Sequence, residues 1–432
     1  MRKKILLVNP PIYDFSAYDF WLKPYGLLRV GGYLRDKADL FLFDYLDRSH
    51  VMNIHDKYKV SDPWGRGHFY RETIAKPDLF KSIRRNFKRF GAPRLQFENY
   101  LAQHGPFDVV LIQTGMTYWY PGLNEVIQDL RCISPHTNII LGGVYATLCT
   151  QHASGLGADL VVPGTDLSAL WRYLELQPDL MQPPLWDLYQ RLDVGALKLS
   201  DGCAFRCTYC SVPNVYQNFY PRDLNLSFNE LSFLHQLGVH NIAFYDDMLL
   251  YRADEVLKPF LNSIIDEEID ISFHTPNALN ARLLTKEIAL LMVKGGFKSF
   301  YIGLESKSDR WHSKTGRKVH MYEFERAVSN LVESGVNPDH ITAYILIGHP
   351  EGNISEVEDT MHYAHSLGIQ VMLAEFSPIP GTPDGDECMR WVDLNEPLWH
   401  NKTVFPMLIL GQDEVNHLKS LCHQLNRNRA VA

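Results

Sequence analysis

The stretch GALKLSDGCAFRCTYCSVP, residues 195–213, joins a short apolar run to three closely spaced cysteines. Cys203, Cys207 and Cys210 follow a CxxxCxxC spacing, with no fourth cysteine close by in the sequence. One interpretation is a set of small buried hydrophobic residues, or half of a disulfide framework. The alternative is a metal site with one coordination position left open. The place of this stretch in the fold helps to decide between these two interpretations.

The apolar run before the cysteines is the first of six that alternate with helical patterns. The six runs cover residues 195–202, 240–247, 270–277, 298–306, 340–350 and 369–380. Six βα units in succession predict a partial (β/α)6 barrel of the TIM type over residues 194–385. In such barrels the chemistry takes place at the carboxyl ends of the strands, and the cysteines directly follow the first strand. The cysteine loop is therefore expected at that rim.

The first 165 residues predict a different α/β unit. Apolar runs rich in Val, Ile and Leu lie at residues 4–9, 38–44, 107–114, 137–143 and 158–164. Runs that are apolar on both faces are typical of a buried parallel sheet. With helical patterns between them they predict a doubly wound, Rossmann-like sheet, whose ligands lie beyond the strands' carboxyl ends. We expect an insertion at about 48–104, a Pro-rich linker at 166–193, and a C-terminal extension at 386–432 whose last helix covers 412–426.

Composition limits the classes of function. The 432 residues predict two or three domains, and a formal charge of −8 demands neither a nucleic-acid nor an anionic-membrane partner. The apolar run near the start is too short for a signal peptide, and no stretch approaches the length of a membrane span. The number of cysteines is odd. We therefore expect a cytoplasmic protein with reduced thiols.

Residues 66–94 hold nine basic and two acidic residues. Contact with RNA or an anionic substrate is one interpretation, but an amphipathic helix with Phe80, Phe87 and Phe90 turned inward is favoured.

The number of cysteines on the loop favours an iron–sulfur cluster over zinc. A closed structural zinc site takes four ligands, usually as two CxxC pairs, and the other four cysteines, at positions 132, 149, 388 and 422, are scattered. Three thiolates on one loop can instead hold three irons of a 4Fe–4S cluster and leave the fourth iron open. Cys203, Cys207 and Cys210 are therefore the candidate ligands.

This arrangement resembles the radical S-adenosylmethionine (SAM) superfamily over residues 194–385. The resemblance implies an enzyme whose open iron binds the amino and carboxylate groups of SAM. An electron from a reductase or a ferredoxin-type donor, passed through the cluster, then cleaves SAM to a 5′-deoxyadenosyl radical, which abstracts hydrogen. The resemblance assigns no catalytic side chain beyond the cofactor contacts.

The same resemblance implies a set of SAM contacts at the ends of the barrel strands. Tyr209 is expected near adenine, Tyr245, Asp246 and Asp247 replace a Gly-Gly-Glu-like contact to the methionine ammonium, and Glu305 is expected near the ribose or the methionine. Ile347 and Gly348 belong to a segment whose backbone meets adenine. Thr275, Asn277 and Arg317 are further candidates, Arg317 for the methionine carboxylate, and for each of these three a structural hydrogen bond is the alternative.

The N-terminal unit resembles the cobalamin-binding subfamily of these enzymes. The segments LLVNPP, KPYGLLRVGGYLR and LGGVYATL carry the likeness, but an Asp-x-His-x-x-Gly motif that would supply a histidine ligand is absent. The resemblance implies a corrin on the carboxyl edge of the sheet, which glycines approach closely and aromatic rings cover. The candidate lining is Asn9, Pro10, Gly26, Thr114, Met116, Tyr118, Gly142, Gly143 and Tyr145.

Two functions follow from these alternatives. In the first, a transferase moves a methyl group from cobalamin to an unactivated carbon, or carries out a related C–H modification. In the second, cobalamin is not bound and the first domain is a module that docks the substrate or a partner. The bulky segment TYWYPG (117–122) is compatible with both, because it either covers the corrin or fills its space. The substrate is left open between a small molecule and a macromolecule, and a nucleic acid is not favoured.

Overall fold

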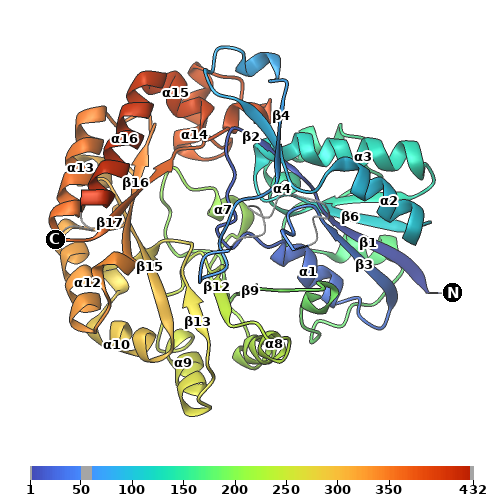
Figure 1. Cartoon of the computed structure of the whole chain (residues 1–432), viewed down its shortest axis with the longest axis horizontal. Helices are drawn as coiled ribbons and strands as arrows, with labels where there is room; N and C mark the ends of the chain where they lie inside the picture. The colour runs from blue at the N-terminus through green and yellow to red at the C-terminus, as the bar shows by residue number, and fades with distance from the viewer. Residues whose placement is uncertain (1, 50–60, 429–432) are drawn as a thin grey trace. The chain divides into compact units, whose positions relative to one another are not determined.

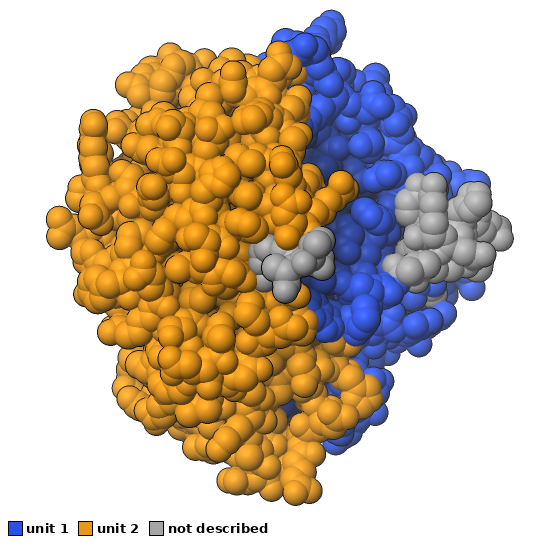
Figure 2. Space-filling view, turned by 60° about the vertical axis from the view of Figure 1, so that its left-hand side comes forward, with its two compact units in different colours: residues 1–195, 229–239, 395–398 blue, residues 196–228, 240–394, 399–432 orange. Residues whose placement is uncertain are grey.

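The computed structural model describes residues 2–49 and 61–428, which form two compact units. Of the described residues, the first comprises 2–49, 61–195, 229–239 and 395–398, and the second comprises 196–228, 240–394 and 399–428 (Figure 2). The proline-rich segment predicted as a linker belongs to the first unit. It contains the helix α6 (Ser168–Leu174), and a Cβ added at Gly32 would come within 2.2 Å of the Pro183 carbonyl oxygen. This segment therefore packs tightly against helix α1 (Tyr25–Gly32).

The first unit is built on a five-stranded sheet in the order β3-β1-β6-β7-β8, and every pairing in it is parallel (Figure 1). Its strands are β1 (Lys3–Asn9), β3 (Ala38–Asp44), β6 (Val109–Gln113), β7 (Asn138–Gly142) and β8 (Leu160–Val161). Each of them lies within one of the predicted apolar runs or extends it by one residue. The doubly wound α/β prediction is confirmed.

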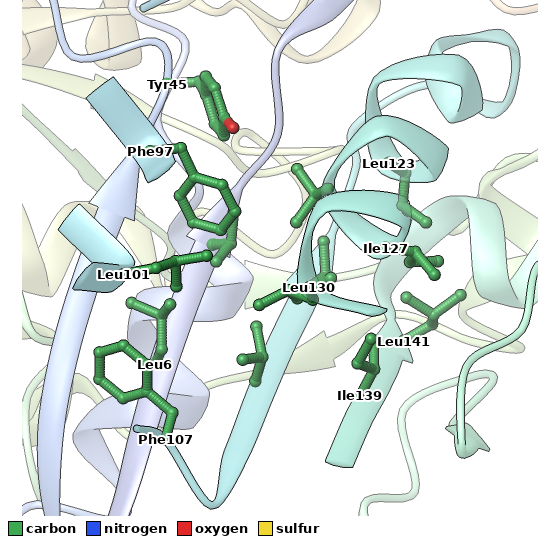
Figure 3. Close-up of a cluster of buried hydrophobic side chains, with 14 of the residues drawn as sticks. Leu6, Tyr45, Phe97, Leu101, Phe107, Leu123, Ile127, Leu130, Ile139 and Leu141 are labelled. Carbon is green, nitrogen blue, oxygen red and sulfur yellow. The ribbon is translucent and has the colours of Figure 1, made fainter. Parts of the chain in front are cut away.

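Alternate residues of these strands point to opposite faces of the sheet, and both faces are covered by helices. One face packs against α2 (Arg94–His104) and α3 (Tyr120–Ile133). Figure 3 shows that core, where Leu6, Ile139 and Leu141 of the sheet meet Phe97, Leu101, Leu123, Ile127 and Leu130 of the helices. The opposite face carries Leu7, and a Cβ added at Gly31 of α1 would come within 2.6 Å of it. Double burial explains why the central strands β1, β6 and β7 contain continuous apolar runs.

The basic insertion is a small sheet and not the predicted amphipathic helix. Strands β2 (Ile12–Asp14), β4 (Arg71–Ile74) and β5 (Phe87–Phe90) pair antiparallel in the order β2-β5-β4. Phe80, Phe87 and Phe90 are buried as expected. The helix prediction is wrong because β5 pairs on both sides, which satisfies its backbone groups without a helix. Residues 50–60 of the predicted insertion lie outside the described residues.

The second unit contains the predicted partial barrel. Its main strands run in the order β17-β16-β15-β13-β12-β9, with β14 (Leu279–Asn280) paired to β15. They are β9 (Val194–Leu197), β12 (Asn241–Phe244), β13 (Ser272–His274), β15 (Phe297–Glu305), β16 (Ile341–Ile347) and β17 (Gln370–Glu375). The pairings from β12 to β17 are parallel. Among the described residues β9 and β17 are the two ends of the row, so the barrel is open.

Helices follow the barrel strands on one side of the sheet (Figure 1). They include α9 (Leu257–Asp266), α10 (Lys286–Lys294), α12 (Met321–Glu333) and α13 (Ile354–Ser366). The C-terminal extension adds α15 (Val404–Leu410) and α16 (Gln412–Asn428), which contains the predicted last helix. Helix α16 packs beside α13 and β17. The C-terminal helix is therefore part of this unit's helical layer.

Candidate functional site

The three cysteines lie on a loop that begins just after β9. The chain first makes the short strand β10 (Ser200–Asp201), which pairs antiparallel with β11 (Tyr220–Pro221). It then turns at Gly202, where φ is +78° and an added Cβ would come within 2.2 Å of the Asn218 carbonyl oxygen. Only glycine fits such a position. This turn brings Cys203, Cys207 and Cys210 to the carboxyl end of the first barrel strand, and all three are free, half-buried thiols.

The three thiols lie within electrostatic reach of one another. Burial raises the pKa of each, for Cys210 to about 11, and the charges of Cys203 and Cys207 add to the effect at Cys210. Among residues 2–49 and 61–428 no three His, Cys, Asp or Glu side chains converge on a point that would hold a single ion. A cubane cluster does not require such convergence, because each cysteine ligates a different iron. The loop is therefore compatible with a cluster.

The two buried cysteines outside the loop have structural partners. The Cys388 thiol donates to the Asp384 carbonyl oxygen at 3.0 Å, and the Cys422 thiol donates to the Val371 carbonyl oxygen at 3.3 Å. Both lie on helical segments of the C-terminal extension. Neither thiol is a candidate for the fourth ligand.

The cysteine loop is held in place by the Asp384 carboxylate. The Thr208 hydroxyl and the His349 Nε2–H both donate to Asp384 Oδ2, at 2.6 and 2.7 Å. The other ring nitrogen of His349 accepts from the Glu351 backbone N–H at 3.1 Å. Because the hydroxyl bonds to the carboxylate and not to the histidine, this is a positioning network and not a nucleophilic triad. Sequence reasoning did not find it, since Thr208 and Asp384 are 176 residues apart.

Asp246 and Asp247, at the end of β12, have different environments. Asp246 is 3% exposed and accepts from the Leu199 N–H at 3.0 Å and from the Ser200 hydroxyl at 2.6 Å. Burial raises the pKa of Asp246 to about 6, although these hydrogen bonds oppose the shift. Its oxygens are thus used to tie β12 to the segment before the cysteines.

Asp247 has the spare acceptor. Its Oδ2 is buried without a hydrogen-bond partner, and the nearest cation is the Lys198 ammonium at 4.0 Å. Burial raises the pKa of Asp247, and its charge in turn raises the pKa of Cys203, so the carboxylate lies close to the cysteine loop. A buried carboxylate oxygen without a partner is costly unless it accepts from a ligand. The structure therefore offers Asp247, rather than Asp246, for a cationic group beside the cysteines.

The remaining predicted SAM residues are divided between structural contacts and the barrel rim. The Thr275 hydroxyl lies between the Ser299 carbonyl and the Tyr301 N–H, and the Asn277 amide donates to the Asp246 carbonyl at 3.1 Å. The Tyr245 N–H donates to the Leu197 carbonyl and Ile347 is fully buried. The Tyr209 ring packs 5.6 Å from the Trp311 ring, between centroids. The observed contacts of Thr275 and Asn277 are therefore structural hydrogen bonds, which was the alternative to a role in SAM binding.

Glu305 and Gly348 share a hollow in the second unit, which Trp311 and His349 also line. Gly348 has φ +77°, and an added Cβ would come within 2.5 Å of Pro406. Arg317 is exposed; its backbone N–H donates to the His312 carbonyl oxygen, and its carbonyl oxygen accepts from the Arg282 guanidinium. The cation that reaches Glu305 is the next residue, Lys318, at 2.8 Å. Sequence reasoning missed Lys318, although it lies beside Arg317 in the segment KTGRK.

The predicted corrin residues are not all at the surface of the first unit. Gly142 and Gly143 are half-buried at the end of β7, Gly26 and Met116 are exposed, and Thr114 is buried at the end of β6. Pro10 is buried, and the Asn9 amide donates to the Asp44 carboxylate at 2.6 Å. Tyr118 and Tyr145 are fully buried, Tyr145 with its hydroxyl 2.5 Å from His152 Nδ1. The edge thus offers glycines to a ligand, while these two rings pack inside the unit.

Residues 197–364 match the family model described as the Radical SAM superfamily. The threonylcarbamoyladenosine tRNA methylthiotransferase MtaB of Thermotoga maritima is 22% identical over 288 residues, which are 60% of this chain and 64% of that protein. The ribosomal protein uS12 methylthiotransferase RimO of Chlorobium phaeovibrioides is 25% identical over 177 residues, 40% of each chain. The radical SAM methyltransferase TsrM of Kitasatospora setae, solved with cobalamin and a 4Fe–4S cluster, has a TM-score of 0.67 at 15% identity, over 98% of this chain and 91% of that one.

These comparisons differ in what they establish. The two methylthiotransferases are matched over less than two thirds of their length. The likeness to TsrM extends over both units and, at its low identity, establishes the fold. Together the matches indicate an enzyme, and proteins of this superfamily use a 4Fe–4S cluster and SAM. In the part of the chain that the structure describes, none of the helices has the length and apolar character needed to cross a membrane.

Proposed function

We propose that this enzyme holds a 4Fe–4S cluster on Cys203, Cys207 and Cys210 and cleaves SAM reductively, since residues 197–364 match the family model of the Radical SAM superfamily. We further propose that it uses the resulting radical for cobalamin-assisted methyl transfer or a related C–H modification. One observation carries the first proposal. Three thiols lie on a single loop at a strand end, within electrostatic reach of the Asp247 carboxylate, which has one buried oxygen without a hydrogen-bond partner.

The residues around the loop have separable roles in this proposal. The three thiolates would each hold one iron, and the Asp247 carboxylate would accept from the ammonium of SAM. The Asp384 carboxylate keeps the loop in position through Thr208. The cluster and SAM together supply a strongly oxidising carbon radical, so the protein's part is to orient them and exclude side reactions.

Anaerobic reconstitution of the full chain with iron and sulfide tests the cluster and the cleavage of SAM. The wild type should bind about four irons per chain and, with a strong reductant, slowly release 5′-deoxyadenosine from SAM. Replacing Cys203, Cys207 and Cys210 together by Ala should remove the iron and the product. Cys132→Ala is the matched control, because Cys132 is exposed and lies in the first unit. Full iron content in the triple variant would contradict the assignment.

The cobalamin part of the proposal rests on the carboxyl edge of the N-terminal sheet. Gly142 is the sharpest probe of it: its φ is −140°, and the nearest atom to an added Cβ is the Val162 carbonyl oxygen at 3.8 Å. A side chain is therefore sterically allowed there, and Gly142→Leu should block a ligand on the edge without straining the sheet. Gly143 is unsuitable, because its φ of +83° makes any substitution strained.

A second candidate is a radical SAM enzyme without cobalamin, whose first unit docks the substrate or a partner. The burial of Tyr118 and Tyr145 favours it, since these rings were expected to face the corrin. The two candidates differ in the visible spectrum and cobalamin content of protein purified anaerobically with and without added cobalamin. Uptake that Gly142→Leu abolishes supports the first candidate, and no uptake by the wild type supports the second.

The contacts of the basic insertion do not favour a nucleic-acid substrate. Several of its arginines are paired with carboxylates of the same chain: Arg66 with Asp62, Arg89 with Glu125, and Arg94 with Asp129. Arg89 and Glu125 are both buried. These pairs reduce the positive charge that the segment offers to a polyanion. Among the relatives, one is named for a tRNA and one for a ribosomal protein, and these names leave the substrate class of this chain open.

A further inference from the structure

We propose that Lys318 is a positioning residue whose fixed charge raises the reduction potential of the cluster assigned to Cys203, Cys207 and Cys210. The inference rests on the proposed function, because it presupposes that cluster. It concerns a residue that the sequence patterns did not single out. Lys318 would act on the cluster through space and would not ligate iron.

The backbone next to Lys318 packs against the cysteine loop. The Thr208 N–H donates to the Thr315 carbonyl oxygen at 3.4 Å. Gly316 has φ +105°, and an added Cβ would lie 3.2 Å from Cys207 Cα and 3.2 Å from the Arg206 carbonyl oxygen. The turn that carries Lys318 is thus in direct contact with the segment between the first and second cysteines.

The Lys318 side chain is directed inward and fixed there. It is 20% exposed, and its ammonium lies 2.8 Å from Oε1 of Glu305, which is 7% exposed. Gly303, two residues before Glu305 on β15, leaves the space for this pair: an added Cβ would come within 2.6 Å of Lys318 Nζ and 2.8 Å of Glu305 Oε1. A larger residue at position 303 would displace the ammonium.

The charge of Lys318 reaches the three candidate ligands. Its ammonium interacts electrostatically with the Cys203, Cys207 and Cys210 thiols. The Glu305 carboxylate, which carries the opposite charge, interacts with Cys207. Arg206 also interacts with Cys203, but its guanidinium is bound to the Cys203 and Gln217 carbonyl oxygens. Lys318 is therefore a cation shared by the whole loop.

A shared cation has a definite consequence for electron transfer. Reduction adds one negative charge to a cluster that three thiolates already make anionic, and a nearby ammonium in a low-dielectric site stabilises that added charge. Removing the ammonium should lower the potential, whereas removing the Glu305 carboxylate should raise it. Opposite shifts from the two partners of one ion pair are not expected from loosened packing or added water, which would move the potential in one direction.

The test is a redox titration of the anaerobically reconstituted full chain without SAM, followed by electron paramagnetic resonance. At the wild-type midpoint, Lys318→Met should lower the ratio of reduced to oxidised cluster at least tenfold, which is about 59 mV for a one-electron couple. Glu305→Gln should raise that ratio. Lys318→Arg keeps the charge and should stay within about threefold of the wild type. Lys314→Met is the control, since Lys314 is half exposed and paired with Glu351.

Two results would overturn the inference. One is a midpoint in Lys318→Met equal to that in Lys314→Met, and the other is a shift of Lys318→Met and Glu305→Gln in the same direction. If Lys318→Met fails to fold, the double variant Lys318→Met/Glu305→Gln removes both charges together and should titrate at a lower potential than Glu305→Gln alone; an equal potential would overturn the inference. Absence of iron from the wild type would instead contradict the proposed function, and the iron content distinguishes that outcome from a cluster indifferent to Lys318.

Discussion

Replacing Asp246 by Asn should remove a pH dependence from the stability of the second unit. Asp246 is fully buried, and its pKa is raised from 3.8 to about 6, chiefly by burial. In the variant, a single amide oxygen can still accept from both the Leu199 N–H and the Ser200 hydroxyl, because both already bond to Oδ1 of the carboxylate. The substitution thus removes the buried charge and keeps these contacts.

The sign follows from the direction of the shift. A folded-state pKa above the unfolded one means that the folded state holds the proton more tightly, so protonation stabilises the fold. That stability is complete below the unfolded pKa of 3.8 and is lost as the pH rises through the folded pKa of about 6. A difference of about two pKa units corresponds to about 3 kcal/mol, of which roughly 1.4 kcal/mol is lost between pH 5 and pH 7.5.

Urea denaturation of wild type and Asp246→Asn at those two pH values measures the effect. Relative to the wild type, the free energy of unfolding of the variant should rise by about 1.4 kcal/mol from pH 5 to pH 7.5. Comparing the two proteins cancels the titration of the other groups. The reasoning is refuted if the difference between them is the same at both pH values. Asp246→Ala should be destabilising at either pH, because the Leu199 N–H and the Ser200 hydroxyl lose their acceptor.

Three further outcomes follow from the site. Asp247→Asn should weaken SAM binding roughly tenfold to a hundredfold, because one charge-assisted hydrogen bond is lost. Its unfolding free energy should change little. Equilibrium dialysis measures the first effect and urea denaturation the second. Asp384→Ala leaves Thr208 and His349 without their shared acceptor. The variant should lose about 2–4 kcal/mol of unfolding free energy and retain less iron after reconstitution. An unchanged urea midpoint would count against the network. Gly142→Leu should abolish cobalamin uptake, read from the visible spectrum, at unchanged iron content, and unaffected uptake would exclude the edge of the sheet as the corrin site.

The pattern of apolar residues along the chain was sufficient to predict the strands of both parallel sheets. The run at 107–114 contains β6, whose first four residues are all buried, because a strand covered on both faces is apolar along its length. The segment 66–94 shows where the same reasoning failed. Its aromatic spacing was compatible with a helix, but β5 pairs with both β2 and β4, and pairing with strands distant in the sequence is not encoded in local periodicity.

The three cysteines show what sequence by itself determined about this protein. Their spacing, and their position after the first of six βα units, depend only on the order of residues along the chain, so the loop, its place at the barrel rim and the superfamily could all be predicted.

The roles of the residues around these cysteines could not be assigned from the sequence. Asp246 and Asp247 are adjacent in sequence and chemically identical, and Arg317 and Lys318 carry the same charge. Only the tertiary structure shows that Asp246 accepts hydrogen bonds from Leu199 and Ser200 while Asp247 keeps a buried oxygen without a hydrogen-bond partner. It also shows that Lys318, and not Arg317, reaches Glu305. The physical reason is that a side chain's function here depends on burial and on partners from other strands, which neighbours in the sequence do not specify.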